Sequence, residues 1–123
     1  MPVIPSPSAF THELPHARFM SLATPSRGSN ELCVWRVHLA PHTEPQKHQL
    51  TREEVFVVLS GRARVVLGTE ELEAGSGDVI VVPPNTDFAL SSASEDPLEA
   101  LCCLPVGGRA RVGERVFTPP WAE

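Results

Sequence analysis

The sequence predicts an all-β protein, folded either as a β-sandwich or as a closed barrel. Short hydrophobic runs rich in β-branched residues recur along the chain, and turn-forming residues separate them. Thirteen prolines fall mainly between these runs. No segment carries an apolar stripe of helical period over three turns, so long helices are not expected. Seven or more short strands at this spacing are typical of sandwiches and barrels.

Seven segments carry the strand pattern. The expected strands cover residues 17–23, 31–40, 54–60, 63–68, 78–83, 87–92 and 97–104. Sequences rich in Gly, Pro, Asn and Asp lie between them and favour tight turns. The chain of 123 residues is long enough for one hydrophobic core. We therefore expect an N-terminal extended arm over residues 1–16 and a single barrel domain over residues 17–123.

Composition argues against several classes of partner. The formal net charge is −5, and the ten basic residues form no cluster, so neither nucleic acid nor an anionic membrane surface is an expected partner. No apolar run approaches the roughly 20 residues that a spanning helix needs. Two of the three cysteines, Cys102 and Cys103, are adjacent and would point to opposite faces of a strand, which disfavours a disulfide between them. We therefore expect a reduced, cytoplasmic protein.

Two motifs carry the chemical information. The stretch HQLTREEVFVVLSG has the form His-x-Leu-x3-Glu-x6-Gly and ends at Gly61. A second stretch begins at Gly77, after 15 intervening residues, and has the form Gly-x5-Pro-x-Asn-x2-Phe. This pair resembles the two signature motifs of the cupin superfamily, in particular its small single-domain, conserved-barrel members. The resemblance implies a double-stranded β-helix, the jelly-roll barrel of cupins.

The sequence departs from the cupin pattern at the metal-binding positions. Metal-dependent cupins take two histidines and a glutamate from the first motif and one histidine from the second. Here His48 and Glu54 keep their places, whereas Leu50 and Phe88 occupy the other two. Asn85 replaces the glycine of the second motif, and asparagine tolerates a positive φ better than most residues. The resemblance thus implies an intact fold with a degenerate metal site.

Catalytic zinc and iron sites usually have three protein ligands, whereas only two remain here. His48 and Glu54 alone predict a weakly bound divalent metal such as Zn, Ni or Fe. His38, His42 or Gln46 could complete the set, because all three lie close to the first motif in sequence. Metal binding therefore stays open at this point.

Strand alternation predicts an apolar cup. In the segment 54–60 it puts Glu54, Phe56 and Val58 on the face that bears the ligand positions. Phe88 and Leu90 share a face in the second motif by the same alternation. The expected ligand-binding lining is Leu50, Phe56, Val58, Phe88 and Leu90, with His48 and Glu54 as a polar, candidate catalytic acid–base pair. A barrel of this size can hold one small ligand.

The segment 31–40 leaves a choice between its two faces. One face carries Cys33, Trp35, Val37 and Leu39, and the other carries Val34, Arg36 and His38. If the second face looked into the cup, Arg36 and His38 would bind the ligand, for example by clamping a carboxylate. If it looked outward, both would be ordinary solvated residues.

Two classes of function follow. The first is a small-molecule-binding cupin for an apolar or aromatic ligand without a strict need for metal. The second is a cupin enzyme, which would be either a metal-free isomerase, epimerase or cyclase using His48 and Glu54, or a dioxygenase-like enzyme with recruited metal ligands. A homodimer is expected by analogy with small cupins, and because the segment 31–40 would otherwise be a long exposed edge strand. We expect the C-terminal FTPPWAE to pack its indole, Trp121, on the barrel or on a partner subunit.

Overall fold

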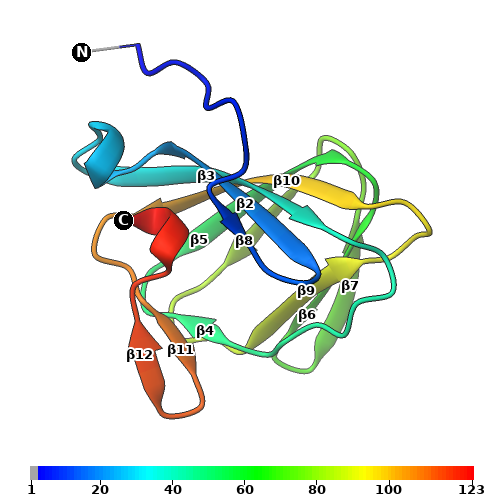
Figure 1. Ribbon diagram of the computed structural model, residues 1–123. Coiled ribbons are helices and arrows are strands. Elements are labelled where there is room, and N and C mark those ends of the chain that lie inside the picture. Colours follow the sequence, from blue (N-terminus) through cyan, green and yellow to red (C-terminus); the bar gives the residue numbers. More distant parts are fainter. Residues whose placement is uncertain (1–2) are drawn as a thin grey trace.

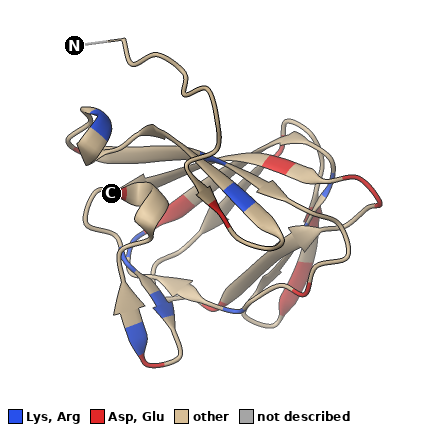
Figure 2. Cartoon of the chain, viewed as in Figure 1, with Lys and Arg blue, Asp and Glu red and all other residues tan. Residues whose placement is uncertain are grey.

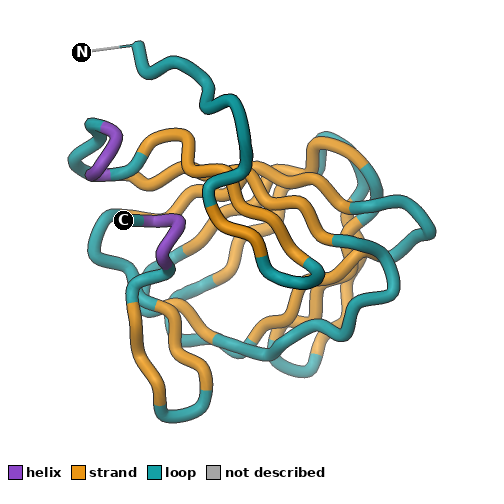
Figure 3. Tube along the Cα trace, viewed as in Figure 1, coloured by secondary structure: helices purple, strands orange, loops and turns teal. Residues whose placement is uncertain are grey.

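The computed structural model describes residues 3–123 and is almost entirely β-structure (Figures 1 and 3). The strands are β1 (His12–Glu13), β2 (Ala17–Ala23), β3 (Leu32–Leu39), β4 (Gln49–Leu50), β5 (Glu54–Ser60), β6 (Ala63–Leu67), β7 (Glu70–Ala74), β8 (Val79–Val82), β9 (Phe88–Ser92), β10 (Leu98–Pro105), β11 (Ala110–Val112) and β12 (Arg115–Phe117). Two short 3-10 helices, Pro25–Arg27 and Pro120–Ala122, complete the described elements. The predicted all-β jelly-roll is confirmed.

The barrel has a large sheet facing two small ones. The large sheet has six antiparallel strands in the order β1-β2-β3-β10-β5-β8. The small sheets have the orders β12-β11-β4 and β7-β6-β9. An isolated antiparallel bridge pairs His48, just before β4, with Phe88, the first residue of β9, and so connects the two small sheets. Buried apolar side chains from all three sheets form one cluster between these layers. The site described below lies in the same interior.

The position of β3 differs from the expectation for this segment. β3 pairs with β2 on one side and with β10 on the other, so it lies inside the large sheet and is not an edge strand. The edges of that sheet are β1 and β8. The expected reason for dimerisation, an exposed edge at residues 31–40, was therefore wrong. β1 pairs with β2, so the last part of the predicted N-terminal arm belongs to the sheet.

Two positions of the motifs have a backbone that few side chains tolerate. Gly61 turns the chain from β5 to β6 with φ +79°, and a Cβ there would lie 2.3 Å from the carbonyl oxygen of Pro97. Only glycine fits this close approach. Asn85 has φ +56° and its backbone N–H donates to the Leu50 carbonyl at 2.7 Å. Asparagine therefore keeps the turn of the second motif.

The outside of the barrel carries the charges. Figure 2 shows Lys and Arg, and likewise Asp and Glu, spread over many elements instead of gathered on one face. None of the helices in residues 3–123 is long and apolar enough to cross a membrane. The three cysteines are free thiols, and burial raises the pKa of Cys102 well above its ordinary value, which makes this thiol a poor nucleophile.

Candidate functional site

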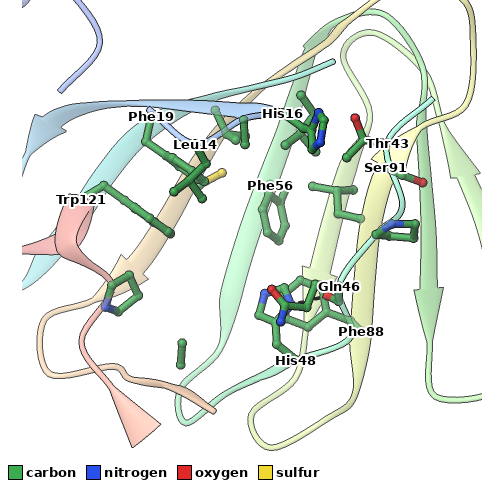
Figure 4. Close-up of a pocket in the computed structure, with 18 of the residues that line it drawn as sticks. Leu14, His16, Phe19, Thr43, Gln46, His48, Phe56, Phe88, Ser91 and Trp121 are labelled. Atoms are coloured by element: carbon green, nitrogen blue, oxygen red, sulfur yellow. Dashed lines mark hydrogen bonds between the residues drawn. The ribbon is translucent and has the colours of Figure 1, made fainter. Parts of the chain in front are cut away.

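A cavity of about 380 Å³ lies inside the barrel between the large sheet and the small ones (Figure 4). Its lining is mostly apolar and comes from β2, β3, β4, β5, β9, β10, β11 and β12, from the loops before β2 and β4, and from the C-terminal tail. Apolar cavities with a few polar groups are the usual form of small-molecule sites. This cavity is therefore the candidate site.

Most of the residues predicted for the cup line this cavity. They are His48, Leu50, Glu54, Phe56, Phe88 and Leu90. Alternation along β5 turns Glu54 and Phe56 inward, as expected. Val58 shares their face but does not line the cavity, because it lies deeper in the packed core. The structure thus places Val58 in the packed core and not in the cavity lining.

Glu54, the first residue of β5, is the unusual group of the cavity. Its side chain is 3% exposed, and its Oε1 atom has no hydrogen-bond partner among the described residues. Burial raises the pKa of this carboxyl to about 8, because the ionised form loses its hydration there. At neutral pH most molecules therefore hold a protonated Glu54, which can donate a hydrogen bond into the cavity.

His48 is held in one orientation by its neighbours. Its backbone exchanges two hydrogen bonds of 2.9 Å with Phe88, and its ring lies 4.2 Å from the Phe88 ring, centroid to centroid. Nδ1 lies 2.9 Å from the carbonyl oxygen of Gln46, and since a carbonyl only accepts, Nδ1 carries the hydrogen. Burial lowers the pKa of His48, and the Gln46 carbonyl opposes that shift. A neutral His48 therefore keeps an acceptor lone pair on Nε2.

Arg36 and His38 lie on the face of β3 that points away from the cavity. Trp35, Val37 and Leu39 of the same strand line the cavity instead. Glu99 of β10 accepts a hydrogen bond from Arg36 Nε at 3.1 Å and lies 2.6 Å from His38 Nδ1. The structure thus places neither residue in the lining of the cavity, and the pair with Glu99 lies on the outer face of the large sheet.

The sequence did not reveal an aromatic end of the cavity. Phe19 of β2 and Trp121 of the C-terminal tail stack with centroids 3.6 Å apart and planes within 4° (Figure 4). Ser21 Oγ donates to the Trp121 carbonyl at 2.7 Å, which ties the tail to the barrel as expected. Alternation over 17–23 could have marked Phe19 as inward, but nothing local relates it to Trp121.

The opposite end of the cavity carries polar side chains. His16, Thr43 and Ser91 lie together toward the top of the view, and Gln46 lies beside His48 (Figure 4). Of these, the sequence singled out Gln46 alone, as a candidate metal ligand. The cavity therefore has an aromatic end and a polar end.

Comparison with known proteins identifies the family. The family model of the cupin domain matches residues 35–104, from β3 to β10, which is more than half of the chain. The chain belongs to the cupin family. Its two altered motifs, described above, are thus those of a true cupin domain.

Individual relatives agree with this assignment. An uncharacterized protein of Methanocaldococcus jannaschii is 38% identical over 53 residues, which cover 43% of this cupin and 42% of that protein. A chain from the crystal structures of DMSP lyases superposes with a TM-score of 0.69 and 26% identity, over 79% of this cupin and 52% of that chain. The polyketide cyclase RemF from Streptomyces resistomycificus superposes with a TM-score of 0.70 and 19% identity, over 80% and 72%. This cupin thus spans only about half the length of the first two relatives.

The donor groups of this cupin do not fit the metal site of metal-dependent cupins. Leu50 and Phe88, 3% and 1% exposed, fill two of the four ligand positions with apolar side chains. His42, a candidate to complete the set, pairs with Glu95 at 2.7 Å, and His38 faces away from the cavity. Within residues 3–123 no group of three or more His, Cys, Asp or Glu side chains is arranged to hold a metal ion. The protonated Glu54 is a poor ligand as well, because ligands must be deprotonated.

Proposed function

We propose that this cupin binds an apolar or aromatic small molecule in its barrel cavity and needs no metal to do so. The observation that carries the proposal is a largely apolar cavity of about 380 Å³ with a buried, unpartnered carboxyl atom on Glu54. A buried polar atom without a partner costs free energy, and a bound ligand can supply that partner. His48, at the polar end, is the second group that would orient the ligand.

A metal-free enzyme is the second candidate. Glu54, protonated at neutral pH, can give a proton, and the neutral His48 can take one, so both partners of acid–base catalysis line one cavity. Isomerisation, epimerisation and cyclisation need only such proton transfers. The similarity to DMSP lyases and to the polyketide cyclase RemF supports a lyase or cyclase within this alternative. Turnover of a bound ligand would separate it from the binding function.

Calorimetric titration with 2-naphthol, a neutral aromatic with one hydroxyl group, tests the binding function. We expect saturable 1:1 binding by the native protein, purified without added metal or chelator. Ala40→Phe should abolish it, because Ala40 lines the cavity and a phenyl ring there would take up its volume. Ala93→Phe is the matched control, since Ala93 is also partly buried in a loop but lies outside the cavity.

Two results would contradict the proposal. Equal loss of binding in both alanine variants would mean that 2-naphthol does not occupy the cavity. Near-stoichiometric transition metal in elemental analysis of the same preparation would contradict the metal-free site.

We also propose that two copies associate through the outer face of the large sheet. An apolar patch lies on this face over β10, β5 and β8, beside the Arg36–Glu99 pair, and includes Val55, Val57, Val79, Val81, Leu101 and Cys103. Val79 and Val81, on the edge strand β8, are 56% and 49% exposed. Such patches mark interaction sites, and a two-fold axis can pair a patch with its own copy.

Light scattering coupled to size-exclusion chromatography checks this association. We expect a dimer for the native chain and a monomer for Val79→Lys with Val81→Lys. Leu72→Lys should stay dimeric, because Leu72 is 44% exposed on β7, away from this face. A native monomer would refute the proposed dimer.

A further inference from the structure

The charges around the cavity restrict the ligand that it can accept. Among the described residues that line it, none is Lys or Arg, and the titratable ones are His16, Glu44, His48, Glu54 and Cys102. Arg36 is paired with Glu99 on the outer face. A carboxylate moved into this cavity would lose its hydration and find no guanidinium or ammonium group. The cavity therefore disfavours anions.

His48, which with Glu54 forms the central polar pair of the cavity, restricts the hydrogen-bonding pattern of the ligand. His48 gives its Nδ1 hydrogen to the Gln46 carbonyl, and no described residue bonds to its Nε2 atom, which is an acceptor. A ligand group that contacts Nε2 must therefore be a donor. A ketone or an ether offers only acceptors, whereas a hydroxyl group donates to one partner and accepts from another. A hydroxyl is thus the simplest group that suits this end of the cavity.

The rings along the cavity restrict its shape. Figure 4 shows the Phe19–Trp121 pair at one end, His48 and Phe88 at the other, and Phe56 between them. The Phe56 and Phe88 rings meet edge to face at 5.9 Å. Aromatic side chains pack well against flat rings, either stacked or edge to face. The apolar part of the ligand is therefore best matched by an aromatic ring system.

We propose that the cavity selects a neutral, hydroxyl-bearing aromatic molecule over the corresponding carboxylate, with its hydroxyl donating to His48 Nε2 and its rings lying toward Phe19 and Trp121. This inference rests on the proposed binding function and adds the chemical class of the ligand. It also assigns His48 as the residue that determines specificity for the hydroxyl.

Three compounds with one ring system test the selection at pH 7 by calorimetry: naphthalene, 2-naphthol and 2-naphthoate. We expect 2-naphthol to bind about tenfold more tightly than naphthalene, as one buried hydrogen bond allows. We expect 2-naphthoate to bind at least about tenfold more weakly than 2-naphthol, because its charge stays unpaired. His48→Phe should bind naphthalene at least as well as the native protein does and lose the preference for 2-naphthol. His38→Phe is the matched control, since His38 faces away from the cavity.

The outcomes separate this inference from the function on which it rests. Failure of all three compounds to bind would contradict the proposed function and the inference together. Equal binding of naphthalene and 2-naphthol would leave the apolar site standing and overturn the selection. Binding of 2-naphthoate as tight as that of 2-naphthol, or a preference for 2-naphthol that survives His48→Phe, would overturn it as well.

Discussion

Replacing Leu50 and Phe88 together by histidine is expected to convert a weak binder of Zn²⁺, Ni²⁺ or Fe²⁺ into a tight one. With His48 and Glu54 the double variant has four candidate ligands at the positions that metal-dependent cupins use, whereas the native chain has two. Four protein ligands complete a zinc shell, so we expect affinity to rise on the order of a hundredfold or more. Titration calorimetry with each metal at constant ionic strength measures the change.

The double variant needs its own controls. Two imidazoles in place of side chains 3% and 1% exposed will destabilise the metal-free fold, so circular dichroism must first show that it is folded. Added metal should then raise its melting temperature, because the ion binds only the folded state. Adding His48→Ala to the double variant should remove most of the gain. Tight metal binding by the native chain that His48→Ala abolishes would mean that Gln46 or another neighbour completes a working metal site.

The second large effect is a loss of stability with rising pH that comes from one carboxyl group. Glu54 has a pKa of about 8 in the folded chain, against an ordinary value of 4.5. The unfolded chain therefore releases this proton near pH 4.5, while the folded chain keeps it until about pH 8. The stability contribution is full below pH 4.5 and is lost progressively up to pH 8. The slope in that window approaches about 1.4 kcal/mol per pH unit.

Glu54→Gln separates this effect from all other titrations. Glutamine keeps the shape of the protonated acid and cannot ionise. The unfolding free energy of the variant should therefore increase relative to that of the native protein as pH rises. The gain should approach roughly 4 kcal/mol between pH 5 and pH 8, measured by urea unfolding. Glu53→Gln, at the exposed neighbouring position, should follow the native profile. If the difference in unfolding free energy between the native protein and Glu54→Gln did not change between pH 5 and pH 8, the Glu54 carboxyl would already be ionised in the folded protein.

Local patterns in the sequence were sufficient for most of the barrel. The seven predicted strands all occur, because each has either alternating burial or a continuous β-branched run with turn residues at its ends. β7 was missed, since Glu70, Glu71, Leu72 and Glu73 are all exposed and show no alternation. The hairpin of β11 and β12 was missed as well, because its strands have three residues each and only one side chain of the six is buried.

The site could be predicted only in part, for a different reason. Glu54 and Phe56 follow from alternation within one motif. The inward face of β3 could not be predicted in this way, because both faces of the strand carry apolar side chains. Its pairing with β10, which places Trp35 opposite Cys102, decides which face points into the cavity. The polar groups that line the cavity come from separate segments: His16 from the loop before β2, Thr43 and Gln46 from the loop before β4, and Ser91 from β9. Local propensity says nothing about which distant segments will meet, so the aromatic end of the cavity had no signal in the sequence.

The stack of Phe19 on Trp121 has a consequence for how the protein folds. It joins two segments that are far apart in the sequence, since Ser21 and Trp121, which share a hydrogen bond, are 100 residues apart. Closing a long loop costs entropy before its contacts are made, and contacts of this separation slow folding. During synthesis, the wall that Trp121 forms cannot be assembled until the segment after β12 has left the ribosome. The strands of the barrel can therefore pair earlier, while the cavity becomes complete only when Trp121 packs on Phe19.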